Sequence, residues 1–127
     1  MAKLKRLPIK YVRDRAKSRY IKDSCCYICG NDDRLDFHHL FTVDVLFEKW
    51  IKTNKILINS AEDIVAVRDA FIEQHEYEMF DYARTLCNNC HKKLHSIYGQ
   101  RPPLSTAQKQ ERWIERQKEK FLIKRSA

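Results

Sequence analysis

The chain has 127 residues, a formal net charge of +8, and only two glycines and three prolines. This length suffices for one domain with a modest core, and the composition excludes collagen-like and low-complexity proteins. No segment approaches the eighteen or so apolar residues of a membrane span, and the basic start lacks the apolar stretch of a secretory signal peptide. We therefore expect a protein of the reducing cytoplasm, where paired cysteines favour zinc over disulfides.

Positive charge is concentrated at the two ends of the chain. Residues 1–22 carry nine Lys or Arg against one Asp, and residues 101–127 carry eight basic residues against three acidic ones. The segment between them is net acidic. Basic segments of this kind favour a polyanionic partner, because Lys and Arg displace counterions condensed on phosphate backbones. Taken alone, such runs can also be plain solvated surface.

The sequence of the N-terminal part predicts a basic arm, a turn and a strand. Residues 1–22 form a basic N-terminal arm, with a short helix over 11–21. The first cysteine pair lies in a turn closed by Gly30 and the Asn and Asp residues that follow it. Residues 34–38 alternate polar and apolar side chains, which is typical of a strand.

Residues 43–80 are expected to form a helical insertion. Apolar side chains at helical spacing predict a first amphipathic helix over 43–54. A second helix is expected over 61–78, beginning at a capping pair formed by Ser60 and Asp63. Both helices are expected to pack on the core.

The C-terminal part predicts a second strand and two further helices. Residues 82–86 tolerate extended structure and are expected to pair with 34–38 in a short antiparallel hairpin. A helix follows the second cysteine pair and ends near Tyr98, where a glycine and two prolines stop it. The basic C-terminal segment 104–127 contains the last helix, over about 105–123. The expected class is α+β, mostly helical.

Two C-x2-C pairs point to a structural zinc site. Cys26 and Cys29 form the first pair, and Cys87 and Cys90 form the second. Cysteines at this spacing can hold one ion from a tight turn, and two pairs complete the four-sulfur shell that structural zinc prefers. Cys25 could substitute for Cys26, which has the better spacing.

Two pairs of histidines accompany the cysteines. His91 and His95 are four residues apart, so on a helix they lie on one face and can share a second ion. Adjacent side chains of a strand point to opposite faces, so His38 and His39 cannot easily bind the same ion. One of them is then free to accept a proton, which suits an imidazole. Alternatively, a helix histidine completes the zinc site or faces solvent beside it.

Together these motifs resemble the HNH endonuclease family. The resemblance rests on the two cysteine pairs, the adjacent histidines, and the sequence TLCNNCHKKLH at residues 85–95. It covers residues 26–98 apart from the insertion. It implies a ββα-metal core with a four-cysteine zinc site within a single domain spanning residues 1–127. Short basic chains with a double C-x2-C pattern also resemble nucleases of phages and mobile elements.

The resemblance implies a role for each histidine. His39 corresponds to the general base, whereas His38, His91 and His95 correspond to ligands of a catalytic divalent metal. The ion is left open among Mg²⁺, Mn²⁺, Ni²⁺ and Zn²⁺, because three neutral nitrogens favour ions softer than magnesium. Products in this family carry 5′-phosphate and 3′-hydroxyl ends.

The chain departs from the family pattern at Tyr82. The family has at this position an asparagine that braces the loop behind the base. Asp81, or an asparagine from elsewhere such as Asn59, is expected to brace the loop instead.

We therefore expect a metal-dependent DNA endonuclease that nicks or cuts duplex DNA, as a monomer or a homodimer. The alternative is a catalytically inactive, zinc-stabilised module that binds nucleic acid without cutting it. The expected DNA contacts lie near the histidines and in the basic arm: Arg84, Lys92, Lys93, Arg13, Arg15, Lys17 and position 18, where the chain has Ser18 directly before Arg19.

Overall fold

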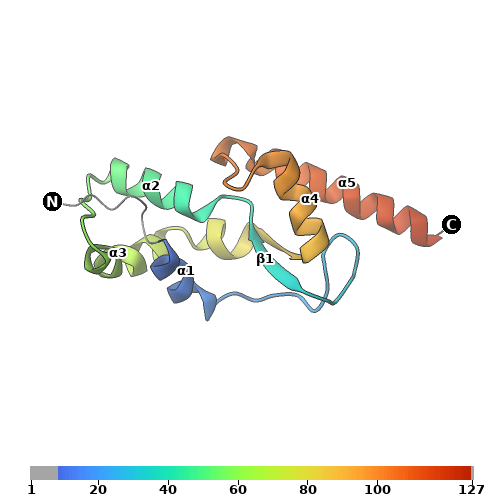
Figure 1. Cartoon of the computed structure of the whole chain (residues 1–127), viewed down its shortest axis with the longest axis horizontal. Helices are drawn as coiled ribbons and strands as arrows, with labels where there is room; N and C mark the ends of the chain where they lie inside the picture. The colour runs from blue at the N-terminus through green and yellow to red at the C-terminus, as the bar shows by residue number, and fades with distance from the viewer. Residues whose placement is uncertain (1–8, 127) are drawn as a thin grey trace.

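The computed structural model describes residues 9–126, with side chains described up to residue 124. The first eight residues of the basic arm and the last residue of the C-terminal segment lie outside this range. The elements, in chain order, are α1 (Lys10–Lys17), β1 (Leu35–His39), α2 (Val43–Thr53), α3 (Ala61–Gln74), a π-helix (Tyr77–Asp81), β2 (Ala83–Cys87), α4 (Asn88–Tyr98), a 3-10 turn (Leu104–Thr106) and α5 (Ala107–Ser126). The expected α+β, mostly helical class is confirmed (Figure 1).

The two strands form an antiparallel hairpin whose long connection holds α2, α3 and the π-helix. Pairing runs from Leu35 opposite Cys87 to His39 opposite Ala83. Because side chains alternate along a strand, His38 and His39 leave β1 on opposite faces. The hairpin therefore presents the two histidines to different neighbours.

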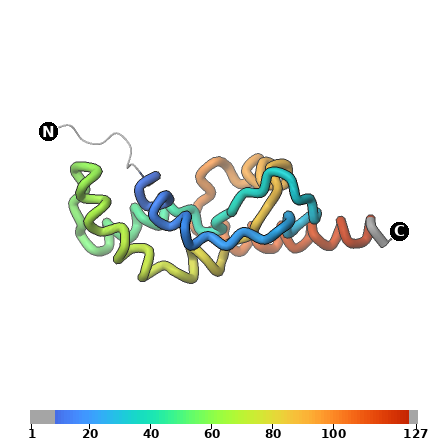
Figure 2. The backbone as a smooth tube through the Cα atoms, turned by 90° about the horizontal axis from the view of Figure 1, so that it is seen from below, coloured from blue at the N-terminus to red at the C-terminus, as the bar shows by residue number. Residues whose placement is uncertain are grey.

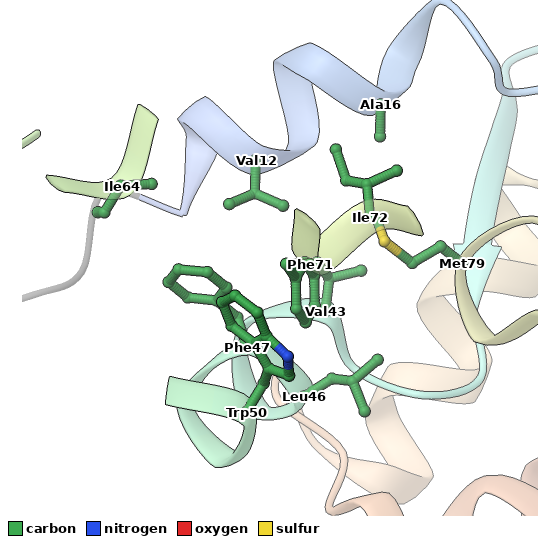
Figure 3. Packing of buried hydrophobic residues seen from close by; sticks show 10 residues of the cluster. All are labelled: Val12, Ala16, Val43, Leu46, Phe47, Trp50, Ile64, Phe71, Ile72 and Met79. Carbon is green, nitrogen blue, oxygen red and sulfur yellow. The ribbon is translucent and has the colours of Figure 1, made fainter. Parts of the chain in front are cut away.

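A first hydrophobic core lies between α1, α2 and α3. Figure 3 shows Val12 of α1 directed toward the aromatic side chains of α2 and α3. Phe47 and Phe71 are completely buried, and their rings meet edge to face with centroids 5.0 Å apart. Burying side chains of this size contributes about 1.5–3 kcal/mol each, so this core holds α1 against the helical insertion.

A second hydrophobic core lies between β2, α4, α5 and the turn before β1. Its buried members include Leu86, Leu94 and Ile114 together with three of the cysteines. Figure 1 shows α1 to α3 at one end of the molecule and α4 with α5 at the other, and Figure 2 shows α5 extending beyond its neighbours. None of the described helices is long and apolar enough to cross a membrane.

The helix boundaries agree with the prediction where a local cap defines them. The capping box of Ser60 and Asp63 is present at the start of α3, as predicted. However, α3 ends at Gln74 rather than near residue 78, because the Nδ1–H of His75 donates to the Phe71 carbonyl over 2.7 Å. The side chain thus occupies a carbonyl that the next helical turn would need.

The helix in the basic arm is also shorter than predicted. It ends at Lys17 rather than at residue 21, and Ser18 is its C-terminal cap. The N–H groups of Arg19 and Tyr20 donate three residues back, over 2.9 and 3.1 Å. Such i to i+3 bonds tighten the last turn and end the helix.

Candidate functional site

Four thiols from two distant segments meet beside the hairpin. Cys26 and Cys29 lie in the turn before β1, which Gly30 closes with a positive φ of 76°. Cys87 ends β2, and Cys90 lies in the first turn of α4. The four sulfurs all lie within 4.8 Å of one another, and those of Cys29 and Cys87 are 3.6 Å apart. This group could hold a metal ion, and four sulfurs suit a tetrahedral one. Cys25 is not part of it.

The thiols strongly influence one another's protonation. Burial would raise the pKa of Cys26, but backbone N–H groups of Cys29, Cys87 and Ile28 face its sulfur, and the pKa falls to about 7. Burial, together with the neighbouring thiols, raises the pKa of Cys90. Because thiolates repel one another at this distance, a shared cation is what would allow all of them to be ionised.

Three imidazoles from β1 and α4 form a second group. His38 Nδ1 lies 3.1 Å from His91 Nε2, which in turn lies 2.9 Å from His95 Nε2. His91 and His95 share one face of α4, as their spacing requires. His38 is only 3% exposed, and burial lowers its pKa to about 3, despite a hydrogen bond to Gln110 that raises it. The ring is therefore neutral near pH 7.

The second nitrogen of each ring meets a hydrogen-bond acceptor. These acceptors are the Gln110 side-chain oxygen 2.8 Å from His38 Nε2, an Asp36 carboxylate oxygen 3.1 Å from His91 Nδ1, and the Gly99 carbonyl 2.7 Å from His95 Nδ1. A neutral imidazole has one proton, so outward donation leaves three lone pairs facing one another. Facing lone pairs repel unless a cation lies between them. Outward donation to carboxylates and carbonyls is also what metal-bound histidines show. The donor set fits a divalent cation.

His39 leaves the other face of β1 and is not part of the three-histidine group. Its ring packs edge-on against Tyr20 and Phe37, with centroids 5.1 and 5.2 Å away. Burial and the charge of Arg13 lower the pKa of His39 to about 4, against a hydrogen bond to the Met79 backbone that raises it. Nε2 is buried without a partner among the described residues, so Nδ1 makes the bond to Met79. Nε2 therefore carries a free lone pair.

A pocket of about 280 Å³ joins His39 to the three-histidine group and borders the first hydrophobic core at Val43 and Tyr20. Arg13 and Lys17, one turn apart on α1, line it together with Tyr20. Burial raises the pKa of Tyr20 to about 12, although Arg13 lowers it, and its hydroxyl is buried without a partner in the described part of the chain. The pocket is thus lined by two basic side chains and by two residues, Tyr20 and His39, each of which has a buried polar atom without a partner within the described chain.

The π-helix supports the His39 ring. Its backbone at Met79 provides the hydrogen bond to the imidazole. Tyr82, which stands where the family pattern has asparagine, follows this helix directly. Among the described residues, no hydrogen bond joins His39 to Asp81 or Asn59, the two residues expected to brace the loop. The expected side-chain brace is thus replaced by a backbone carbonyl.

The basic residues predicted on α1 separate onto two faces. Arg13 and Lys17 line the pocket. Arg15 instead pairs with Asp69 of α3, Nε to Oδ1, over 2.9 Å. Arg19 likewise pairs with Glu76 over 2.8 Å, and position 18 is the serine cap of the helix. The acidic insertion therefore pairs with one face of α1. On the other face, Arg13 has no ion pair among the described residues, and Lys17 makes an exposed pair with Asp14 of the same helix over 3.5 Å.

The basic residues predicted around the hairpin also differ in exposure. Lys92 and Lys93 are exposed on α4, next to His91 in the chain. Arg84 is partly buried, pairs with Glu111 of α5 over 3.1 Å and lies over the Tyr27 ring. Arg84 thus holds β2 against α5.

Two residues that contact the histidine group escaped prediction. Asp36 lies two residues before His38, so strand alternation places it on the same face of β1, and this signal was available in the sequence. Gln110 is separated from His38 by 72 residues and carries no local pattern that could have identified it.

Comparison with known proteins places this arrangement in a class. No solved structure matches the chain. The model of a phage T5 nicking endonuclease family matches residues 1–125. The α+β chain with its two candidate metal-binding groups is therefore an endonuclease. More specifically, it belongs to this nicking endonuclease family.

Proposed function

We propose that the protein is a metal-dependent endonuclease of the HNH type, which nicks duplex DNA by hydrolysing one phosphodiester bond. The observation that carries this proposal is the convergence of three imidazole nitrogens in a pocket that His39 also lines, together with the His39 Nε2 lone pair, which has no partner among the described residues. Membership of the nicking endonuclease family supports the class of substrate and the single-strand cut. One site cutting one strand requires only a monomer.

His39 is the general base in this proposal. Its Nε2, buried without a partner among the described residues, is proposed to accept a proton from the attacking water, and the bond to Met79 keeps that nitrogen oriented. A divalent ion held by His38, His91 and His95 would supply positive charge to the scissile phosphate and the departing 3′ oxygen. Nitrogen ligands favour manganese, nickel, cobalt or zinc there.

The four thiols hold a structural zinc ion in this proposal. Four thiolates complete a tetrahedral shell and leave no position for water or substrate, which is the arrangement of structural sites. Such an ion would tie the turn before β1 to the start of α4. It would therefore help to fix His91, which follows Cys90 directly.

Arg13 and Lys17 contact DNA phosphates next to the cut in this proposal. Both line the pocket that holds His39, and Arg13 acts electrostatically on that ring. Lys92 and Lys93 are proposed to contact the backbone farther along. Arg15 and Arg84 are engaged with acidic side chains and contribute to the fold instead.

The function is tested with supercoiled plasmid DNA. The protein with zinc at the thiol site is expected to convert supercoiled plasmid to open circle when Mg²⁺, Mn²⁺, Ni²⁺ or Zn²⁺ is added, and not without an added ion. DNA ligase should reseal the product, because the ends are a 5′-phosphate and a 3′-hydroxyl. Binding without conversion by any of these ions would instead indicate a non-cutting nucleic-acid-binding module.

The two faces of α1 give a matched test of DNA binding. The Arg13→Ala/Lys17→Ala variant is expected to reduce the slope of log affinity against log salt by about 1.8, since each phosphate contact contributes about 0.9. Arg15→Ala/Arg19→Ala removes the same charge from two arginines that pair with Asp69 and Glu76, and it should change the slope little. Fluorescence anisotropy of labelled duplex DNA without divalent ions measures both. Equal effects would contradict the assignment.

A further inference from the structure

Gln110 connects the last helix to the three-histidine group. It lies on α5 and is 0% exposed. Its side-chain oxygen is 2.8 Å from His38 Nε2, and its amide nitrogen donates to the Leu40 carbonyl over 3.2 Å and to the Thr106 hydroxyl oxygen over 3.0 Å. Every polar atom of this buried side chain therefore has a partner, as buried polar groups require.

The partners of the amide nitrogen define which end of the side chain faces His38. The Leu40 carbonyl can only accept, and the Thr106 hydroxyl already donates its proton to the Pro103 carbonyl over 2.6 Å. Both acceptors need the amide N–H groups of Gln110, so the oxygen is the atom that faces the imidazole. His38 Nε2 must then be the donor.

This donation determines the atom with which His38 can bind an ion. A neutral imidazole with its proton on Nε2 has its lone pair on Nδ1, and His38 Nδ1 lies 3.1 Å from His91 Nε2. With the proton on Nδ1 instead, an N–H group would point into the cation site. The side-chain oxygen of Gln110 therefore favours the tautomer of His38 with its proton on Nε2, which is the tautomer that can bind a metal ion through Nδ1.

We propose that Gln110 is a positioning residue for the catalytic ion: it makes His38 bind through Nδ1, while His91 and His95 bind through Nε2. The inference rests on the proposed function in one respect, that the three histidines hold an ion. It assigns to α5, outside the hairpin and α4 that carry the ligands, a direct influence on the reaction site.

The unmodified protein gives the first test. Long-range ¹H–¹⁵N correlation spectra of the histidine rings are recorded with zinc at the thiol site and no other ion. They are expected to show His38 with its proton on Nε2, and His91 and His95 with theirs on Nδ1. A His38 ring with its proton on Nδ1 would overturn the proposal without any substitution.

Variants at Gln110 give the second test, with Ni²⁺ as the probe because imidazole suits this ion. Gln110→Met preserves the side-chain length and removes the acceptor, so calorimetric titration should show Ni²⁺ binding about 10- to 100-fold weaker. Gln110→Glu keeps an acceptor for His38 and should bind Ni²⁺ more tightly than Gln110→Met. Gln108→Met, an exposed glutamine on the same helix, is the matched control and should bind like the parent.

The outcomes separate this inference from the proposed function. Parental Ni²⁺ affinity in Gln110→Met would overturn it, and so would equal losses in the Met and Glu variants, since packing rather than the acceptor would then matter. If Gln110→Met does not fold, as circular dichroism reports, the spectra of the parent and of Gln110→Glu still decide. Expected spectra and affinities without plasmid nicking would remove the proposed function and leave the role of Gln110 intact.

Discussion

The His39→Ala variant is expected to lose at least about 100-fold in the rate of plasmid nicking, while it still binds duplex DNA. A general base contributes about 10²- to 10⁴-fold to a rate, and no other imidazole among the described residues has a free nitrogen in this pocket outside the three-histidine group. Initial rates of open-circle formation measure the loss. Anisotropy with labelled duplex measures binding.

The matched control for this variant is His75→Ala. His75 is also a partly buried histidine with a backbone hydrogen bond, and its ring packs on Phe71 outside the pocket. It should nick at nearly the parental rate. The melting temperature of His39→Ala should lie close to that of the parent, because the ring packs on the partly buried Tyr20 and Phe37 rather than among the fully buried side chains of the first core. Parental nicking by His39→Ala would show that another group takes the proton.

The Cys90→Ser variant is expected to unfold the domain or to lower its melting temperature sharply. Structural zinc contributes about 10–16 kcal/mol of apparent binding energy to small zinc-dependent domains, and replacing one of four thiolates removes part of it. A loss of only about 3 kcal/mol would already lower the melting temperature by roughly 10 °C. Cys87→Ser should behave alike. Thermal circular dichroism and zinc content measured on the same samples check both variants.

Cys25→Ser is the control for the thiol site. Cys25 directly precedes Cys26 but is not a member of the four-thiol group. Its replacement should leave one zinc ion per chain and a melting temperature near that of the parent. If Cys25→Ser and Cys90→Ser lost stability equally, or if Cys90→Ser kept its zinc, the proposal of a four-sulfur structural site would be wrong.

Elements with a local signal in the sequence were predicted well. The capping box of Ser60 and Asp63 depends on side chains three residues apart, and the predicted start of α3 was correct. The two strands lie within one residue of their predicted positions because alternation is read from neighbouring residues. The cysteine and histidine spacings likewise indicated which side chains lie together, since each pair is held by its own turn or helix.

Features that depend on distant partners were not predictable in this way. Arg15 is paired with an acidic side chain and Arg13 lines the pocket, and this difference arises because α3 brings Asp69 to one face of α1. Gln110 acquires its role from the packing of α5 against β1. The π-helix arises where α3 has been ended by His75, and no sequence pattern placed its Met79 carbonyl beside His39. In each case the contact depends on how segments far apart in the sequence pack against each other.

The chain order of the candidate metal-binding residues has a consequence for synthesis on the ribosome. Cys29 and Cys87 are 58 residues apart, and both candidate ion sites join a segment before residue 40 to one after residue 86. A nascent chain can close neither loop until α4 has been translated, and the Gln110 contact waits for α5. In the proposed mechanism, a polypeptide that terminates early carries the basic arm and His39 but no assembled ion site, so it cannot damage the DNA of the cell that makes it.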